Sequence, residues 1–340
     1  MTSARDEASP DLRARFDAAF APVQHAIEGG RIPGAVFGMV DLRKGRVAAA
    51  SGHAMLVPDK RDMTLDTWFD LASLTKVLFT TPRILALAEA GRIDLDAPLT
   101  SVIPDFRQYD PDAWERKITF RQCLGHQTPF PASVPIFTYG DNPKLLRHFV
   151  LQHEWTAGPA TYSDINFILL GIALERLEGQ SIRQMDPGVG FSFSGPVDNT
   201  AATEDCPWRG RVLVGEVHDE NCYAFEGAGN AGLFGTVTSV LDRAEKLLRS
   251  ADSPSVRLMR TPLSAKRTHG WERPYQGWSG GDSAGASTIG HTGFTGVGLW
   301  IDFERERAWT LLTNRVHPSR WRDSGIADLR RSVADIVNAA

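Results

Sequence analysis

Short apolar runs near both ends of the chain constrain the fold more than any other feature of the sequence. Residues 35–41 and 46–51 are two such runs, and Leu-Arg-Lys-Gly at 42–45 separates them. This pattern predicts a hairpin in which Gly45 takes the positive-φ turn position. Residues 296–302 and 308–314 form a second pair around the charged residues 303–307. We expect these runs to join in one antiparallel sheet.

Helical periodicity fills the rest of the chain. Apolar residues at three- and four-residue spacing predict a helix over residues 11–27, and further helices are expected at 74–90, 142–152, 165–177, 240–250 and 324–339. The predicted fold class is α+β, with an antiparallel sheet built from both chain ends, flanking helices and an inserted, mostly helical region. We divide the chain into a sheet domain of residues 1–90 and 210–340 and a helical domain of residues 91–209, with the active site at their interface.

Composition narrows the class of protein. The chain has 340 residues, 42% of them hydrophobic, which suffices for a large core. A formal net charge of -4 gives no basic footprint, so no nucleic-acid partner is expected. The three cysteines lie far apart without metal-ligand spacing, and we expect buried free thiols. Three tryptophans are expected in the core or the cleft wall: Trp68, Trp300 and Trp321.

No apolar stretch reaches the roughly 18 residues that a transmembrane helix needs, so no membrane span is expected. Residues 1–30 also lack the apolar segment of a signal peptide. We expect a cytoplasmic protein as the chain stands, or a periplasmic one if an export signal was removed.

A serine and a lysine stand three residues apart at the start of a predicted helix. Residues 70–76 read Asp-Leu-Ala-Ser-Leu-Thr-Lys, so Ser73 and Lys76 share a helix face. A serine becomes a nucleophile when a base takes its proton, and a lysine can serve if burial or a nearby cation lowers its pKa. The N–H groups at a helix start stabilise developing negative charge. The alternative is a chance spacing in which Ser73 only caps the helix.

Tyr162 opens a second motif, Tyr-Ser-Asp at residues 162–164, on a turn into the next predicted helix. A tyrosine beside a protonated lysine can have its phenol pKa lowered, and it can then act as a base towards a serine or return a proton to a leaving group. The alternative is a half-buried tyrosine whose hydroxyl is hydrogen-bonded.

Residues 290–296 read Gly-His-Thr-Gly-Phe-Thr-Gly and precede the second hairpin. Their glycines allow a ligand to approach the backbone closely. We expect a backbone N–H here to serve an oxyanion, while His291 and Thr292 bind the polar end of a substrate. Alone, this segment would be read as a glycine-rich turn.

In this order the three motifs resemble those of the penicillin-recognising serine hydrolases: class C β-lactamases, D,D-carboxypeptidases and related esterases. That family carries SxxK, then YxN or YSx, then KTG or HTG, which correspond here to residues 73–76, 162–164 and 291–293. The resemblance implies a β-lactamase/transpeptidase-like fold and an acyl-enzyme on Ser73, with Lys76 and Tyr162 handling protons. It also implies that the N–H groups of Ser73 and Phe294 hold the oxyanion, beside Gly293.

Two departures from the family pattern bear on the substrate. Asp164 stands where many members have Asn, so an amide donor becomes, if ionised, an acceptor only. His291 stands where β-lactamases have Lys, and an imidazole holds a carboxylate less firmly. Both changes favour an esterase over a β-lactamase. The family segment His-Thr-Ser-Gly appears as Gly-His-Gln-Thr-Pro at residues 125–129, so His126 is expected to be structural.

Two other patterns are not expected to carry chemistry. Residues 227–232, Gly-Ala-Gly-Asn-Ala-Gly, match the dinucleotide fingerprint but lack a βαβ unit, so we expect a tight loop lining the cleft and no cofactor. His218, Asp219 and Glu220 are consecutive and do not share a face. We therefore expect no metal site, with His218 and Asp219 as hydrogen-bonded loop anchors.

The sequence thus predicts a serine hydrolase that acts on a small ester, amide or peptide through an acyl-enzyme. Three alternatives stay open: a D,D-carboxypeptidase or other peptidoglycan peptidase, a weak β-lactamase, and a penicillin-binding-like protein without turnover. Substrate identity depends on loop shapes that the sequence does not give, and the oligomeric state does not follow from it either.

Overall fold

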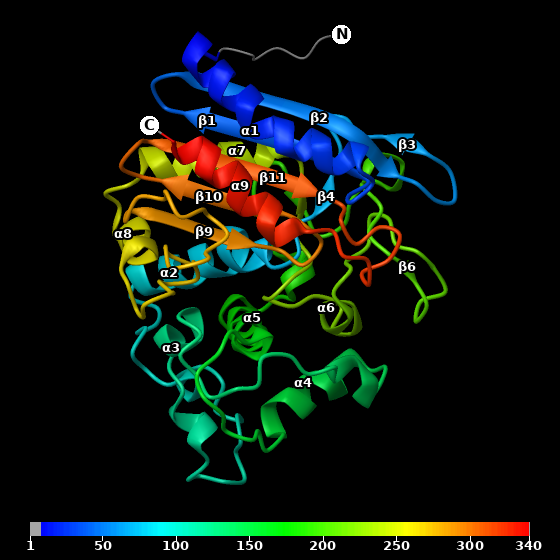
Figure 1. Ribbon diagram of the computed structural model, residues 1–340. Helices are drawn as coiled ribbons and strands as arrows, with labels where there is room; N and C mark the ends of the chain where they lie inside the picture. Colours follow the sequence, from blue (N-terminus) through cyan, green and yellow to red (C-terminus); the bar gives the residue numbers. More distant parts are fainter. Residues whose placement is uncertain (1–7, 340) are drawn as a thin grey trace.

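A six-stranded antiparallel sheet lies at the centre of the computed structural model, which describes residues 8–339 (Figure 1). β1 (Gly34–Asp41) pairs on one side with β2 (Gly45–Met55) and on the other with β11 (Arg307–Thr313). β10 (Gly298–Asp302) and β9 (Thr288–Thr292) follow β11, and β3 (Arg61–Asp62) forms the far edge beside β2. The predicted sheet built from both chain ends is confirmed, as is the hairpin with Gly45 at positive φ.

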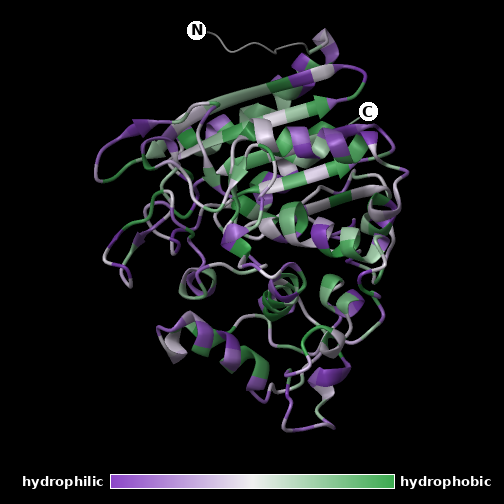
Figure 2. Cartoon of the chain, turned by 180° about the vertical axis from the view of Figure 1, so that it is seen from behind, coloured by the Kyte–Doolittle hydropathy of each residue, from purple (hydrophilic) through white to green (hydrophobic). Residues whose placement is uncertain are grey.

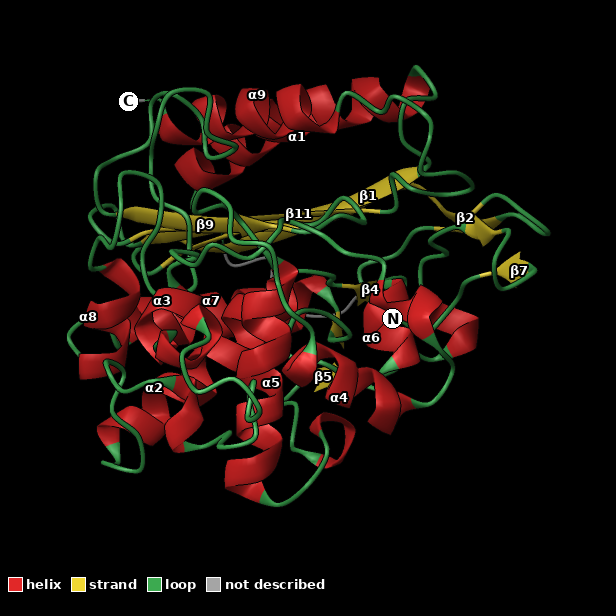
Figure 3. Ribbon diagram, turned by 90° about the horizontal axis from the view of Figure 1, so that it is seen from below, coloured by secondary structure: helices red, strands yellow, loops and turns green. Residues whose placement is uncertain are grey.

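The two faces of the sheet carry different helices (Figure 3). α1 (Pro10–Glu28) and α9 (Ile326–Asn338) pack side by side on one face. Their core includes stacked rings of Phe16 and Phe37, whose centroids lie 5.1 Å apart, and of Trp300 and Trp309, 5.9 Å apart. The other face is covered by α7 (Val237–Arg249) and, beyond it, by α2 (Thr81–Glu89) and α5 (Asp164–Glu178), over a larger core.

The remaining elements are short. The helices are α3 (Phe120–Leu124), α4 (Pro143–Gln152), α6 (Glu220–Ala224) and α8 (Pro254–Arg260). β4 (Phe69–Asp70), β8 (Phe234–Gly235) and β5 (Phe191–Ser192) form a small sheet, and β6 (Asp205–Cys206) pairs with β7 (Arg211–Val212). Coloured by hydropathy, the central strands are largely hydrophobic, while the short edge strand β3 and many outer turns are hydrophilic (Figure 2).

The helix expected over residues 74–90 differs in kind from the prediction. Lys76–Thr80 is a π-helical turn, and the regular helix α2 begins only at Thr81. Pro82 has no N–H, so the carbonyl of Leu78, four residues earlier, instead accepts from Arg243 Nη1 at 3.0 Å. Single π-turns of this kind are frequent at functional sites. The other predicted helices are confirmed to within a few residues at each end.

The predictions for the cysteines and tryptophans can also be compared with the structure. The cysteines are free and buried, as expected. Trp300 lies in the core, but Trp321 is 88% exposed, so its prediction as core or cleft wall is wrong. Within residues 8–339, no helix combines the length and the apolar character needed to cross a membrane. The division into two domains at residues 90 and 210 remains a prediction.

Candidate active site

Ser73 follows β4 directly, in a turn that is fixed by a buried carboxylate. Asp70 accepts the N–H of Ala72 at 2.8 Å with one oxygen and the N–H of His218 at 2.6 Å with the other. Burial raises the pKa of Asp70 although both N–H groups oppose that shift. Ala72 has φ 45°, a conformation that non-glycine residues rarely adopt. The turn therefore holds Ser73 in one defined orientation ahead of the helix.

Lys76 is fully buried, and its ammonium group has two hydrogen-bond acceptors and one ion-pair partner. Nζ lies 2.8 Å from Ser73 Oγ, 2.9 Å from the carbonyl oxygen of Asn230 and 2.7 Å from Asp164 Oδ1. Burial alone would lower the pKa of Lys76, but the charge of Asp164 and the contacts with Tyr162 outweigh it and raise that pKa above its usual value. Lys76 is therefore a cation at rest, so the lowered pKa under which a lysine could act directly as base is not present, because Asp164 is its partner.

Tyr162 lies just before α5, with its ring enclosed by cations and an imidazole. Lys76 Nζ is 5.3 Å from the ring centroid, Arg267 Cζ is 4.9 Å from it, and the His126 ring is 4.3 Å away. Burial and the charge of Asp164 raise the pKa of the Tyr162 phenol, while Lys76 and the hydrogen bonds with Lys76 and Ser73 act to lower it. The net direction is upward, so the lowering that a neighbouring ammonium can cause is outweighed here by burial.

His126 supports the Tyr162 turn from behind. Its Nδ1 accepts the N–H of Ser163 at 3.1 Å, and Asn166 Nδ2 lies 3.3 Å from the same atom. Burial, with Arg267 and Lys76 nearby, holds the pKa of His126 well below its usual range, so the ring is neutral. The predicted structural character of His126 fits these contacts.

The end of β9 brings residues 291–293 against the Ser73 turn. A Cβ on Gly293 would stand 2.9 Å from the carbonyl oxygen of Leu71, so only glycine fits at this approach. His291 is 2% exposed, and its Nδ1 lies 2.9 Å from the carbonyl oxygen of Thr292. Burial, then the charges of Arg267 and Lys76, keep the pKa of His291 well below its usual range. His291 is therefore neutral and brings no positive charge to the site.

The backbone offers two donors beside the nucleophile. Among the described residues, no acceptor is found for the N–H groups of Ser73 and Phe294. Arg330 Nη2 fixes the intervening turn by donating to the carbonyl oxygens of Gly293 at 3.0 Å and Val297 at 2.7 Å. Preorganised donors of this kind suit a tetrahedral oxyanion.

Two pockets meet at Ser73. The first has a volume of about 190 Å³, and we call it the acidic pocket because its charged lining residues are mainly carboxylates: Asp164, Asp219 and Glu220, with His218 and Arg320. The second has a volume of about 380 Å³, and we call it the arginine pocket for Arg267, Arg315 and Arg330, which line it with Glu272, Tyr162, Asp164 and residues 291–294. Ser73, Asp164 and Phe294 line both pockets.

Arg267 lines the site but was not predicted from the sequence. It lies in an irregular segment between α8 and β9 with no motif around it. Its Nη2 pairs with Glu272 Oε1 at 3.1 Å, while its Nη1 is buried and, among the described residues, has no hydrogen-bond partner. Because Arg267 lines the arginine pocket, its guanidinium is suited to a ligand oxygen there, in particular a carboxylate.

The other predicted loops lie at or near the site. The loop of residues 227–232 reaches Lys76 through the Asn230 carbonyl, and Ala231 lines the acidic pocket. His218 Nε2 lies 3.2 Å from Glu204 Oε2, and Asp219 caps α6 by accepting the N–H of Cys222 at 2.7 Å. Both residues thus act as the predicted anchors.

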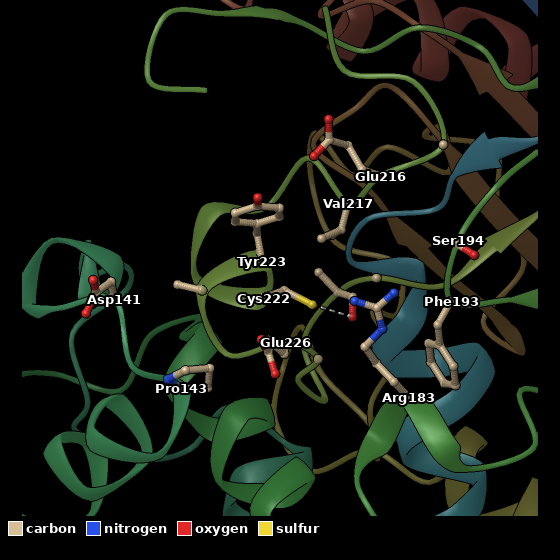
Figure 4. Close-up of a pocket in the computed structure, with 15 residues that line it drawn as sticks. Asp141, Pro143, Arg183, Phe193, Ser194, Glu216, Val217, Cys222, Tyr223 and Glu226 are labelled. Carbon is tan, nitrogen blue, oxygen red and sulfur yellow. Dashed lines mark hydrogen bonds between the residues drawn. The ribbon is translucent and has the colours of Figure 1, made fainter. Parts of the chain in front are cut away.

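A third pocket of about 460 Å³ lies beyond that loop and does not include Ser73 (Figure 4). Arg183, Glu216 and Tyr223 project from its wall. Cys222 Sγ donates to the carbonyl oxygen of Ala231 at 3.2 Å, and Ala231 lines both this pocket and the acidic pocket.

The comparisons with known proteins agree with this arrangement. A sequence model of the Beta-lactamase family matches residues 16–331. The chain belongs to this family. N-acetylmuramyl-L-alanine amidase of Bacillus subtilis (strain 168) is 26% identical, with 84% of this chain and 78% of that protein covered. A putative D-alanyl-D-alanine carboxypeptidase of Escherichia coli (strain K12) is 25% identical, with 75% and 70% covered.

Solved structures of the family superimpose over nearly the whole chain. A β-lactamase from Sulfitobacter sp. EE-36 gives a TM-score of 0.74 at 20% identity, covering 96% of this chain and 99% of its own. EstCE1, described as a hydrolase with promiscuous acyltransferase activity, gives 0.72 at 20% identity, covering 97% and 100%. At these identities the likeness concerns the fold, and it confirms the predicted β-lactamase/transpeptidase-like architecture.

Proposed function

We propose that this member of the Beta-lactamase family is a serine hydrolase that cleaves an ester or amide through an acyl-enzyme on Ser73. The observation that carries the proposal is the distance of 2.8 Å between Lys76 Nζ and Ser73 Oγ, in a turn where the N–H groups of Ser73 and Phe294 are free to bind an oxyanion. A nucleophile, its proton-handling partner and its oxyanion donors then converge on one point.

The reaction would proceed in two stages. Lys76 first gives up one of its own protons. Ser73 Oγ then attacks the carbonyl carbon while its proton passes to Lys76 Nζ beside Tyr162, and the carbonyl oxygen gains charge against the two N–H groups. Tyr162 then protonates the leaving group, the carbon–leaving-group bond breaks, and an ester on Ser73 remains. Water, deprotonated by the same pair, releases the acyl group. No metal or cofactor takes part in this scheme.

Ser73→Ala provides the test. With p-nitrophenyl acetate as substrate, we expect kcat/KM to fall by about 10³-fold or more, because the nucleophile is lost while binding and the oxyanion donors remain. Ser133→Ala is the matched control, since Ser133 lines the acidic pocket without contacting Lys76. Undiminished turnover by Ser73→Ala would refute the proposal.

A second candidate is a peptidase that recognises a carboxylate, as in a D,D-carboxypeptidase. The observation that favours it is the Arg267 guanidinium, which lines the arginine pocket and supplies a cation that the neutral His291 does not. The relatives named for D-alanyl-D-alanine carboxypeptidase and N-acetylmuramyl-L-alanine amidase also support an amide substrate. Release of D-alanine from a D-Ala-D-Ala peptide, compared with hydrolysis of a neutral ester and of nitrocefin, separates these activities.

A further inference from the structure

Asp164 occupies a position from which it touches both the cation of the site and the substrate space. It is the first residue of α5, where the partial positive charge of a helix start favours a carboxylate. Its side chain is 24% exposed, and its Oδ1 lies 2.7 Å from the buried Nζ of Lys76. The same Nζ lies 2.8 Å from Ser73 Oγ. Lys76 Nζ therefore bridges the nucleophile and a carboxylate.

At rest, neither proton-handling partner of Ser73 is a free base. Lys76 is held as an ammonium by its ion pair with Asp164 and by two hydrogen bonds, and Tyr162 is held as a neutral phenol, because the pKa of each is raised. Asp164 is the acceptor that lies one proton transfer away, through Lys76. With an asparagine at position 164, Lys76 would have no proton acceptor there, since an amide does not take up a proton near neutral pH.

We propose that Asp164 is the terminal proton acceptor of the acylation step and that it acts through Lys76; this rests on the proposed function of Ser73. One N–H bond of Lys76 breaks as its proton moves to Asp164 Oδ1, and Nζ takes the proton of Ser73 while Oγ bonds to the carbonyl carbon. The carbonyl electron pair moves to the oxygen. Tyr162 then protonates the leaving group and takes a proton from Lys76 in its place. Lys76 in turn takes back the proton that Asp164 had accepted. The resting charges are thereby restored.

Other charged groups surround this relay and set the conditions under which it titrates. They face Asp164 from the two pockets and comprise Asp219, Glu220, His218 and Arg320 on one side and Arg267, Glu272, His291, Arg315 and Arg330 on the other. Asp219 and Glu220 oppose a negative Asp164, while the arginines favour it. All of them remain in place when Asp164 alone is replaced, so a change in the pH profile of that variant reports on the relay.

The test is the dependence of kcat/KM for p-nitrophenyl acetate on pH, from about pH 4 to about pH 10, in the wild type, Asp164→Asn and Asp164→Glu. In the wild type, Asp164 takes the proton of Lys76 during the reaction, so Lys76 need not be deprotonated beforehand. In Asp164→Asn, Lys76 must itself lose a proton before it accepts one. The acid limb, where kcat/KM falls on the acid side of the profile, therefore moves up in pH by about one unit or more. Near pH 6 the variant loses about tenfold or more in kcat/KM, and this loss is recovered as pH rises. Asp164→Glu restores the limb towards its original position.

A merely structural ion pair would give a different result. Asp164→Asn would then lose activity by the same factor at every pH, with the acid limb unmoved, and that outcome overturns this proposal alone. Labelling of Asp164→Asn by a fluorophosphonate at alkaline pH checks that the variant is folded and that Ser73 is intact. Full activity of Ser73→Ala would instead overturn the proposed function, and this proposal with it.

Discussion

The acidic pocket and the arginine pocket share Ser73, Asp164 and Phe294, yet they offer a substrate opposite surroundings. In the acidic pocket, Arg320 is already paired with Glu204 and Glu220, and Asp164 is paired with Lys76, which leaves Asp219 to set the charge. In the arginine pocket, two carboxylates, Glu272 and the shared Asp164, face three arginines. The difference indicates that a polar substrate lies across Ser73 in one direction, with its anionic end towards Arg267.

The two pockets also differ in how the chain builds them. The acidic pocket takes its carboxylates from the start of α5 and from the start of α6, where Asp219 serves as helix cap. The arginines come from an irregular segment, from the residues after β11 and from α9. Two of these are committed to structure: Arg330 holds the turn of Gly293, and Arg315 Nε donates to the carbonyl oxygen of Phe294 at 2.8 Å. This leaves Arg267 as the guanidinium available to a ligand.

Loss of the lysine that stands between the two pockets has the largest expected effect. Lys76→Ala should lower kcat/KM for p-nitrophenyl acetate by about 10²- to 10⁴-fold, because the Ser73 proton loses its acceptor. Lys60→Ala, at an exposed position, is the matched control. Thermal unfolding of both variants checks that the loss is chemical. An active, folded Lys76→Ala protein would mean that the proton leaves Ser73 by another route.

Removing Glu204 weakens the anchoring of Arg320 in the acidic pocket. Hydrogen bonds from His218 and Arg320 outweigh burial and lower the pKa of Glu204 to about 2. Because this pKa is depressed on folding, the stabilisation is present above the usual glutamate pKa and is lost as pH falls towards 2. Glu204→Gln should lower the free energy of unfolding by about 3 kcal/mol at neutral pH, where the Arg320 guanidinium loses a buried carboxylate partner.

Denaturant unfolding of Glu204→Gln at several pH values measures this effect, and the deficit relative to the wild type should shrink on acidification. Glu178→Gln is the control, because its pair with Arg92 is more exposed and is worth less than about 1 kcal/mol. An equal deficit at neutral and acid pH would show that lost packing, and no charge effect, explains the change.

Arg267→Ala tests whether the arginine pocket binds the anionic end of a substrate, because the variant can be compared on a charged and on a neutral substrate. For an amide or ester with a carboxylate in its leaving group, we expect kcat/KM to fall by about 10- to 100-fold, the value of a charge-assisted hydrogen bond of about 1.5–3 kcal/mol. A neutral ester should change by less than about threefold. Arg273→Ala serves as control, since Arg273 lines neither pocket. Equal losses with both substrates would contradict the assigned direction of binding.

The smallest effect is expected for Asp219→Asn. Burial and the charge of Asp164 raise the pKa of Asp219 to about 6, so its ionisation destabilises the fold as pH rises from the usual aspartate range through about 6. Asparagine keeps the helix cap and removes this charge, so the variant should be more stable than the wild type above that pH, by at most about 1 kcal/mol. Melting temperatures at acid and neutral pH measure it, and a destabilised variant at neutral pH would contradict the assignment.

Much of the fold could be predicted from local patterns. The hairpins at both ends follow from apolar runs around Gly45 and the charged residues 303–307, and α1 follows from its helical periodicity. The π-turn over Lys76–Thr80 could not be foreseen, since it depends on Arg243 of α7 reaching the Leu78 carbonyl.

The residues of the site could likewise be predicted where they form sequence motifs, and not where they depend on tertiary contacts. Ser73, Lys76 and residues 291–293 were found because their spacing and order form motifs, and the fold brings them together with Tyr162. Their electrostatics were not predictable: Asp164 raises the pKa of Lys76 only because α5 starts beside the buried ammonium. Arg267 gave no sequence signal because its position depends on a tertiary contact with Glu272 and the Tyr162 ring.

The most direct test of the central claim is the intact mass of the protein after treatment with a fluorophosphonate, followed by peptide mapping. We predict one phosphonyl group per chain, located on Ser73, and no adduct in Ser73→Ala. A wild-type protein that remains unlabelled, or an adduct on another residue that persists in Ser73→Ala, would contradict the account.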